Sequence, residues 1–339
     1  MLVVDDSSIC REVLIDILER DHDIEVVGEA ASGEQALDRM ASLAPDVITL
    51  DIQMPGMGGL AAIEAIMARQ PKPILVVTGL DTRERDLAVE ATRRGALALA
   101  NKVSDDDPVG AKHLRESVRR LAAIEVEDQA TIDLPTSAHR VWPTPAASST
   151  TPILAFGCSA GGPKALAEVL DALPRDLPAS IAIANHLPAD FVSAYARLLW
   201  TQHRFPVALA DTPLAPEPGT IVLAPGGCDL VLVDGHFVGQ RSRSDALWCP
   251  RVDLLFESVA AAPGAHVGVV LSGLGSDGAR GLSMMRARDK LTLVQSQRSA
   301  SVWGMPNAAV GSAVEILATA EIPRTIVRWL ELRAPKKSS

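Results

Sequence analysis

Five residues within the first 102 carry groups that could act together chemically, and each stands at the end of an apolar segment. They are Asp5 and Asp6 after LVV, Asp51 after VITL, Thr78 in VVTG and Lys102 after ALAN. Neighbouring carboxylates repel each other unless a cation neutralises them, and Mg²⁺ prefers such oxygen ligands. The set predicts a phosphoryl-transfer site with Asp51 as the nucleophile. The metal and Lys102 would neutralise the phosphoryl oxygens, and Thr78 would donate a hydrogen bond to them.

Each of these residues, taken alone, also has a structural explanation. Asp6 or Ser7 could simply cap the first helix, because short polar side chains accept hydrogen bonds from the first N–H groups of a helix. The functional interpretation depends on all five groups following strands, since the carboxyl ends of parallel strands meet at one edge of a sheet.

A second candidate nucleophile lies in GCSAGG at residues 157–162, directly after the apolar run PILAF. The phosphate-loop pattern GxxxxGK[ST] fails there because Pro163 stands in the place of the lysine and has no N–H to offer a phosphate. The dinucleotide pattern GxGxxG fails because Ser159 occupies its second glycine. The stretch fits GxSxG, in which small flanking residues allow a tight turn that presents the serine hydroxyl.

A serine nucleophile needs a base and an orienting acid. Of the seven histidines only His186 ends an apolar strand, in SIAIANH, and Asp277 follows another in VVLSGLGSDG. We therefore predict that His186 accepts the Ser159 proton and that Asp277 stabilises the imidazolium. The N–H of Ala160 is the first candidate for an oxyanion donor, and the 274–276 loop is a guess for the second.

The stretch GLGSDG at 273–278 also matches the dinucleotide pattern GxGxxG, which offers an alternative. Asp277 inside that loop would repel the pyrophosphate, and no acid follows at the usual spacing of about 20 residues. The order Ser, His, Asp along the chain also differs from the Ser, Asp, His order of ordinary α/β-hydrolases.

Apolar runs alternate with amphipathic segments through both halves of the chain, which predicts two α/β domains. We expect a flavodoxin-like domain with a parallel five-stranded sheet over residues 1–124. Residues 125–150, rich in Pro, Ser and Thr, would form a linker. A doubly wound α/β domain with a mostly parallel sheet would span 151–335. The DG turn in CDLVLVDGHFVGQ predicts a hairpin, and so an antiparallel portion of that sheet.

The composition excludes several classes of function. A net charge of −10, with one Tyr and five Phe, argues against nucleic-acid binding. No apolar run reaches the length of about 20 residues that spans a membrane, and the acidic start MLVVDDSS does not resemble a signal peptide. The four scattered cysteines form no CxxC pair, so neither a zinc site nor a disulfide framework is indicated. We expect a cytoplasmic protein that does not insert into membranes.

The first 120 residues or so resemble response-regulator receiver domains through VVDDS, LDIQMPGMGG, VVTG and the late lysine. The resemblance implies that Asp51 is the phosphoacceptor, that Asp5, Asp6, Asp51 and the backbone of Gln53 hold Mg²⁺, and that a sensor histidine kinase is the phosphodonor. Two positions depart from the family. Val103 replaces the usual proline after Lys102, and Leu99 stands where an aromatic switch residue is usual.

Residues 151–335 resemble the catalytic domain of the chemotaxis protein-glutamate methylesterases, the CheB family. The matching stretches are GCSAGGP, NHLP, VLAPG, PRVDLLFESV, LSGLGSDGARG and VWGMPNAAV. The resemblance implies hydrolysis of glutamyl γ-methyl esters on the cytoplasmic domains of chemoreceptors, deamidation of receptor glutamines, and a triad of Ser159, His186 and Asp277 that uses no cofactor. Ala160 and Arg251 replace the family's Thr and Ser, and Arg251 bears on substrate preference.

These resemblances lead to a hypothesis about regulation. The unphosphorylated receiver would block Ser159, and phosphorylation of Asp51 would shift the population toward an open form. Two alternatives remain: a receiver-controlled binding module whose esterase domain is inactive, and an esterase or deamidase with a substrate other than a chemoreceptor.

Overall fold

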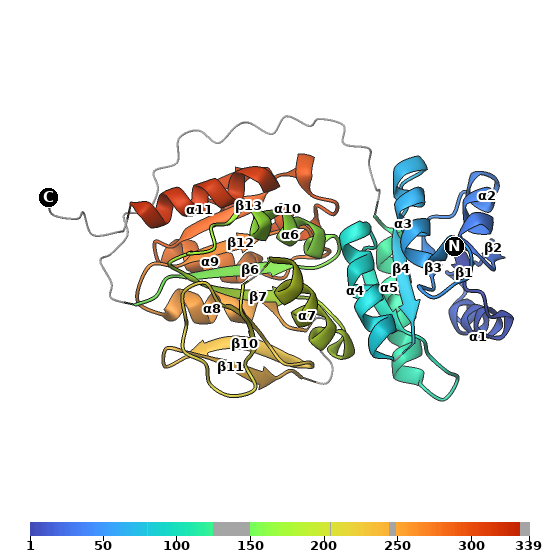
Figure 1. Cartoon of the computed structure of the whole chain (residues 1–339), viewed down its shortest axis with the longest axis horizontal. Coiled ribbons are helices and arrows are strands. Elements are labelled where there is room, and N and C mark those ends of the chain that lie inside the picture. The colour runs from blue at the N-terminus through green and yellow to red at the C-terminus, as the bar shows by residue number, and fades with distance from the viewer. Residues whose placement is uncertain (80, 125–149, 204, 244–248, 333–339) are drawn as a thin grey trace, which may run out of the picture. The chain divides into compact units, whose positions relative to one another are not determined.

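The computed structural model describes residues 1–79, 81–124, 150–203, 205–243 and 249–332. The chain divides into two compact units, Met1–Asp128 and Gln129–Ser339 (Figure 1). The predicted linker at 125–150 falls outside the described residues except for Thr150. None of the helices in the described ranges is long and apolar enough to cross a membrane.

The first unit contains a five-stranded sheet in the order β2-β1-β3-β4-β5, with every pairing parallel, as expected. Helices α2, α3 and α4 pack in a row, and α1 packs on α5. The strands are β1 (Leu2–Val4), β2 (Gly28–Ala30), β3 (Ile48–Leu50), β4 (Ile74–Thr78) and β5 (Ala98–Asn101), and the helices are α1 (Ser8–Glu19), α2 (Gly33–Leu43), α3 (Gly58–Arg69), α4 (Thr82–Arg94) and α5 (Pro108–Ala122).

Short polar residues begin the helices of this unit. The Ser7 hydroxyl accepts a hydrogen bond from the Cys10 N–H at 3.3 Å, so Ser7 caps α1 and Asp6 does not. Asp81 and Asp107 cap α4 and α5 in the same way. Asp6 is exposed and lies beside Asp5 and Asp51 at the carboxyl edge of the sheet.

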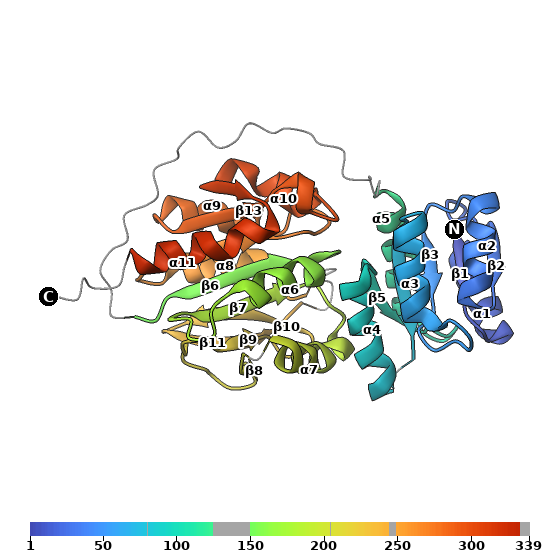
Figure 2. The same cartoon turned by 45° about the horizontal axis from the view of Figure 1, so that its top comes forward.

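The second unit is built around a seven-stranded parallel sheet in the order β14-β13-β12-β6-β7-β9-β8 (Figure 2). Its strands are β6 (Ile153–Cys158), β7 (Ser180–Asn185), β8 (Val207–Leu209), β9 (Ile221–Leu223), β12 (Val267–Val270), β13 (Leu291–Gln295) and β14 (Glu315–Leu317). Its helices are α6 (Gly162–Ala172), α7 (Val192–His203), α8 (Val252–Ala261), α9 (Ala279–Ala287), α10 (Gly304–Ala309) and α11 (Ile322–Glu331), with 3₁₀ turns η1 (Ala189–Phe191), η2 (Gln297–Ser299), η3 (Val310–Ser312) and η4 (Thr319–Glu321).

The strand order reverses beside β6. The chain passes from β6 to β7 on one side of it and later returns to β12 on the other side. Ligands of doubly wound sheets bind outside the carboxyl ends of the strands at such a reversal. The loops that follow β6, β7 and β12 are therefore the place to look for a site.

The hairpin differs from our expectation. Strands β10 (Cys228–Val233) and β11 (His236–Arg241) form a separate two-stranded antiparallel sheet, so the prediction of an antiparallel portion within the main sheet was wrong. The DG turn itself forms, with positive φ at both Asp234 and Gly235. The hairpin packs on α8, where the Leu232 N–H donates to the Ser258 hydroxyl at 2.9 Å. Burying Leu230 and Phe237 there stabilises the hairpin outside the main sheet.

The sequence analysis missed the two edge strands β8 and β14. Each has three residues, all only half-buried. Three residues are too few to show the alternation that identifies a strand, and partial burial weakens the apolar signal further.

Candidate functional site

The acids of the first unit lie close together, as predicted. Oxygen atoms of Asp5, Asp6 and Asp51 all lie within 4.8 Å of one another. Asp5 and Asp51 are buried and Asp6 is exposed. The backbone explains this convergence, because β1 and β3 are paired neighbours and both end at this edge. Gln53, two residues beyond Asp51, is exposed.

Lys102 connects two of the three acids. Its Nζ lies 2.7 Å from Asp5 Oδ2 and 2.9 Å from Asp51 Oδ2. Burial lowers the pKa of Lys102, but the hydrogen bonds to the two carboxylates outweigh it and raise that pKa above its ordinary value. Burial raises the pKa of the Asp51 carboxyl, and the Lys102 hydrogen bond opposes this only in part. One lysine thus does not fully compensate the buried negative charge.

The donor set fits a hard divalent cation. Three carboxylates whose oxygen atoms lie within 4.8 Å of one another supply the ligands that Mg²⁺ prefers. The negative charge of Asp51, which Lys102 compensates only in part, favours a cation there. The Thr78 hydroxyl, fully buried at the end of β4, has no hydrogen-bond partner within the part of the chain that the structure describes. Such a hydroxyl can donate to an oxygen of a bound group.

A backbone hydrogen bond joins the ends of β5 and β4. The Lys102 N–H donates to the Thr78 carbonyl at 2.8 Å. Leu99 in β5 is buried, with 6% of its surface exposed.

Ser159 lies in the tight turn between β6 and α6. Its N–H donates to the Ser272 carbonyl at 3.0 Å, and its carbonyl accepts from the Gly162 N–H at 2.7 Å. The turn needs glycine at position 161, where φ is +71° and a Cβ would lie 2.8 Å from the Ser272 hydroxyl. Ser159 is 7% exposed. The GxSxG pattern therefore forms the strand-to-helix turn that we predicted.

His186 is the first residue after β7. In the parallel register Cys158 pairs with Asn185, so Ser159 and His186 are the next residues on adjacent strands. The His186 N–H donates to the Cys158 carbonyl at 3.1 Å, which holds the two chain segments together. His186 Nε2 lies 2.8 Å from Asp277 Oδ2, and the imidazole is 3% exposed.

Asp277, in the loop between β12 and α9, is held by more than His186. Its Oδ2 accepts from the Val252 N–H at 2.8 Å and its Oδ1 from the Asp253 N–H at 2.9 Å. These N–H groups open α8, whose positive end favours a carboxylate. Burial raises the pKa of Asp277, but the hydrogen bonds from His186 and these two N–H groups lower it below its ordinary value.

Asp253, whose N–H donates to Asp277, also has a carboxylate that accepts hydrogen bonds from the segment after Asp277. The sequence analysis did not single out Asp253. Its Oδ1 accepts from the N–H groups of Gly278 and Gly281 at 3.0 and 2.8 Å, which open α9. Asp277 thus holds the start of α8, while Asp253, in the first turn of α8, holds the start of α9. The available signal was an acid in the first turn of the helix VDLLFESV. Nothing in the sequence indicated its hydrogen-bond partners, which lie 25 and 28 residues further along the chain.

Arg251, one of the departures from the family pattern, is held by a buried acid. The fully buried Asp229 in β10 accepts from the Arg251 N–H at 2.7 Å and lies 2.6 Å from Arg251 Nη2. The Ser242 hydroxyl donates to the same carboxylate at 2.7 Å. Arg251 therefore ties the hairpin to the start of α8, whose first two N–H groups hold Asp277.

The oxyanion donors proposed from the sequence are available. Within the described ranges, the Ala160 N–H donates to no protein acceptor, and neither do the N–H groups of residues 274–276. Ala160 itself is 5% exposed. Residues 275 and 276 are exposed, so the Ala160 N–H is the buried candidate for stabilising charge that develops in a transition state.

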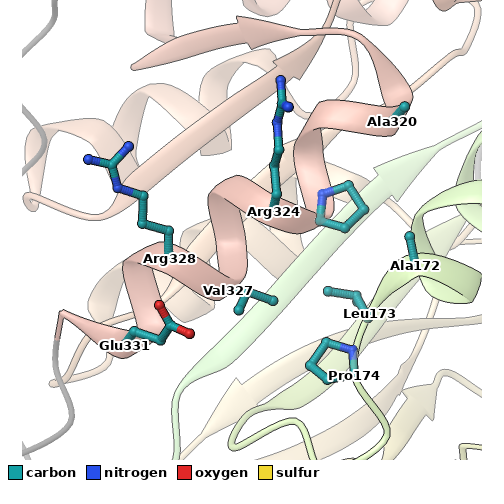
Figure 3. Close-up of a pocket in the computed structure, with 9 residues that line it drawn as sticks. Ala172, Leu173, Pro174, Ala320, Arg324, Val327, Arg328 and Glu331 are labelled. Atoms are coloured by element: carbon teal, nitrogen blue, oxygen red, sulfur yellow. The ribbon is translucent and has the colours of Figure 1, made fainter.

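A separate groove of about 480 Å³ lies between the end of α6 and α11 (Figure 3). Ala172, Leu173 and Pro174 line one side, and Arg324, Arg328 and Glu331 line the other. None of its lining residues belongs to the Ser159 site or to the acid cluster, so we do not assign the chemistry to it.

A parallel α/β unit with an acid cluster at its carboxyl edge defines a receiver, and a second α/β unit with a serine beside a His–Asp pair defines a candidate serine hydrolase. The response regulator receiver domain model matches residues 1–113, and the CheB methylesterase model matches residues 154–326. The chain belongs to the CheB methylesterase family and carries a response regulator receiver domain. This confirms both resemblances drawn from the sequence.

Relatives match along nearly the whole chain. Protein-glutamate methylesterase/protein-glutamine glutaminase 2 of Xanthomonas oryzae pv. oryzae (strain MAFF 311018) is 36% identical over 98% of this chain and 97% of its own length. A protein-glutamate methylesterase/protein-glutamine glutaminase of Halalkalibacterium halodurans is 36% identical over 91% of both chains. The solved catalytic domain of Thermotoga maritima CheB methylesterase is 26% identical, with a TM-score of 0.50 over 53% of this chain and 99% of that chain.

Proposed function

We propose that this chain is a phosphorylation-regulated serine hydrolase that removes methyl groups from glutamyl γ-methyl esters of chemoreceptors and deamidates receptor glutamines. The substrate would be the cytoplasmic domain of a methylated receptor, and a sensor histidine kinase would be the phosphodonor. The names of the relatives and the two family matches support the reaction class. The observation that carries the mechanism is the 2.8 Å bond between His186 and Asp277, beside Ser159 in the strand register.

The ester reaction proceeds in two steps. Ser159 Oγ attacks the γ-carbonyl carbon while His186 takes its proton, and the protonated imidazole then returns that proton to the leaving methanol. His186 then deprotonates a water molecule, which attacks the acyl-serine; the bond to Ser159 Oγ breaks, the imidazolium returns the proton to that oxygen, and the glutamate is released. For a glutamine side chain the leaving group is ammonia. The Ala160 N–H stabilises the oxyanion in both steps.

The ring orientation supports Nδ1 of His186 as the nitrogen that takes part in the proton transfers. His186 Nε2 faces Asp277, so Nε2 carries a proton and Nδ1 acts as the base toward Ser159. Asp277 remains ionised, because its pKa is lowered, and it stabilises the imidazolium that forms. The hydrogen bonds from α8 hold the carboxylate in place, so that the imidazole needs no reorientation during the reaction.

Regulation belongs to the first unit. Asp5, Asp6, Asp51 and the backbone of Gln53 would hold Mg²⁺, which neutralises phosphoryl charge when bound. An Asp51 oxygen attacks the phosphorus of the kinase phosphohistidine, and the P–N bond breaks as the histidine leaves. Lys102 pairs with the phosphoryl oxygens, and the Thr78 hydroxyl donates to them. Phosphorylation of Asp51 then raises the rate of hydrolysis at Ser159.

The test measures methanol release from methylated receptor by the wild type, Ser159→Ala and Asp51→Asn, each with and without a phosphodonor. We expect release that needs Ser159 and that rises with the phosphodonor only when Asp51 is present. Absence of release from the wild type in both conditions would contradict the proposal, and would favour a binding module or another substrate. To test deamidation, the same variants are given a receptor with glutamine at the modified sites, and the release of ammonia is measured.

A further inference from the structure

We propose that Ser272 is a positioning residue of the hydrolase site, which fixes the direction of the Ala160 N–H by holding the peptide units on both sides of it. The inference rests on the proposed function, in which Ser159 is the nucleophile and this N–H stabilises the oxyanion.

Ser272 lies two residues beyond the end of β12 and is fully buried. Its carbonyl accepts from the Ser159 N–H at 3.0 Å, and its hydroxyl donates to the Ala160 carbonyl at 2.8 Å. One residue thus binds the peptide unit before Ser159 and the peptide unit after Ala160. The unit between them carries the Ala160 N–H. Because peptide units are planar, fixing both neighbours leaves the middle unit little freedom to turn.

Ser272 is itself firmly held. Its hydroxyl accepts from the Val302 N–H at 2.9 Å, and its own N–H donates to Gln295 Oε1 at 2.7 Å. The Gln295 amide is fully buried and its Nε2 donates to the Ser299 carbonyl and the Thr319 hydroxyl at 2.8 and 3.0 Å. A fully satisfied polar network of this kind is rigid in a protein interior.

The hydroxyl proton of Ser272 has two acceptors within reach. The Ala160 carbonyl lies at 2.8 Å and the Val302 carbonyl at 3.3 Å. The shorter distance is the usual one for a hydroxyl donor, so Ala160 is the main acceptor. Close packing restricts the same turn, because a Cβ at Gly273 would lie 2.9 Å from Ser159 Cβ.

The expected effect follows from the geometry of an oxyanion hole. Loss of one donor costs about 10²- to 10³-fold in kcat, and a misplacement of about 1 Å can cost about 10²-fold. Ser272→Ala keeps the carbonyl that holds Ser159 and removes only the hydroxyl bonds. We therefore expect kcat to fall by about 10- to 100-fold with KM changed by less than about threefold.

Thr292 provides a matched control in the same sheet. It is fully buried, its hydroxyl donates to the Ser312 carbonyl at 2.7 Å, and it accepts from the Val314 N–H at 3.1 Å. Thr292→Val thus removes the same kind of bond pair, whose partners Ser312 and Val314 lie outside the Ser159 turn. A purely structural role for Ser272 predicts that both variants lose stability and that neither changes kcat.

The experiment uses the full chain without a phosphodonor and measures kcat and KM for methanol release, together with Tm. The variants are Ser272→Ala, Ser272→Cys, Thr292→Val and Ser159→Ala. The proposal expects a kcat loss for Ser272→Ala that Thr292→Val does not share, and a smaller loss for Ser272→Cys, whose thiol is a weaker donor. If Ser272→Ala does not fold, the comparison of Ser272→Cys with Thr292→Val decides.

A kcat for Ser272→Ala that matches Thr292→Val, or a loss carried by KM, overturns the proposal and leaves the proposed function intact. Wild-type release that persists in Ser159→Ala, or that is absent altogether, overturns the proposed function and this inference with it.

Discussion

Asp51 of the receiver is a buried carboxylate and Asp277 of the hydrolase unit a half-buried one, and both lie beyond strand ends of parallel sheets, but their surroundings stabilise them differently. Asp51 has one backbone N–H, from Ile52 at 2.7 Å, and shares Lys102 with Asp5. Asp277 has His186 and two N–H groups at the start of α8. The pKa of the Asp51 carboxyl is accordingly raised, chiefly by burial, and that of Asp277 is lowered.

This difference indicates that the Asp51 site needs a bound ligand to balance its charge, whereas the protein alone balances the charge of Asp277. Asp51 and its neighbours have more negative charge than their protein partners compensate, and they also adjoin a hydroxyl with no partner among the described residues. Such a site changes when a cation or a phosphoryl group arrives, which suits a switch. Asp277 is fully hydrogen-bonded by the protein, which suits a catalytic group that must not reorganise.

The largest expected effect separates the two units. Ser159→Ala should lower hydrolysis by about 10⁵- to 10⁶-fold, because the nucleophile is lost. Phosphorylation of the same variant by a phosphodonor should proceed as in the wild type. Methanol release and the phosphoryl group retained on the protein after an acid quench, measured on one preparation, check the hydrolase and the receiver. A variant that lost both activities would show that the two sites are not separable.

Next in size is Asp277→Asn. The amide still packs, but its NH₂ group faces donors from α8 and does not stabilise an imidazolium, so kcat should fall by about 10³- to 10⁴-fold. KM should change little. Steady-state kinetics on methylated receptor give the two constants. A loss of less than tenfold would mean that His186 does not depend on this carboxylate.

Removing Mg²⁺ should affect only the receiver. EDTA should abolish phosphoryl incorporation and remove the stimulation of hydrolysis by the phosphodonor, which we expect to be about 5- to 150-fold. The unstimulated rate should be unchanged. Asp51→Asn is the matched control, since it should lack stimulation whether or not Mg²⁺ is present. Unstimulated hydrolysis that fell with EDTA would place a metal in the hydrolase reaction.

A smaller effect is expected at Asp253. Asp253→Ala removes the acceptor for two N–H groups of α9 and should cost about 1–2 kcal/mol of stability, with a kcat loss of about tenfold through Asp277. Asp253→Asn keeps an acceptor oxygen and should recover most of both. Unfolding in urea, followed by tryptophan fluorescence, reports on the hydrolase half, because all five tryptophans lie after residue 140. Equal kcat values for the two variants and the wild type would limit Asp253 to a structural role.

The smallest effect is a pH dependence of stability. A carboxyl whose pKa is lowered on folding contributes stability that is complete above its unfolded value, near 3.8 for Asp277, and that disappears as the pH falls through the folded value. The wild type should therefore exceed Asp277→Asn in stability at pH 6, and the difference should shrink below pH 4. Urea unfolding at both pH values measures it. A difference that grew on acidification would reverse the sign of the assigned pKa shift.

Particular residues show how far the sequence leads. Ser159, His186 and the receiver acids were identifiable because each directly follows an apolar run, and a run of this kind is a local signal. The seven-stranded sheet was identifiable as α/β, but its edge strands β8 and β14 were not, because three half-buried residues carry little pattern. The hairpin was found by its DG turn, yet its separation from the main sheet depends on packing against α8.

The sequence by itself determined the two α/β halves, the acid cluster, the candidate triad and the family, since these depend on residue type and spacing along the chain. Only the tertiary structure decided which His186 nitrogen faces Asp277, that Asp253 and Asp277 hold each other's helices, and that Ser272 binds Ala160 across 112 residues. These are hydrogen bonds between loops brought together by strand order. In three of the four the partner of the side chain is a backbone N–H or carbonyl group, which every sequence contains and which therefore gives no signal until the sheet has placed it.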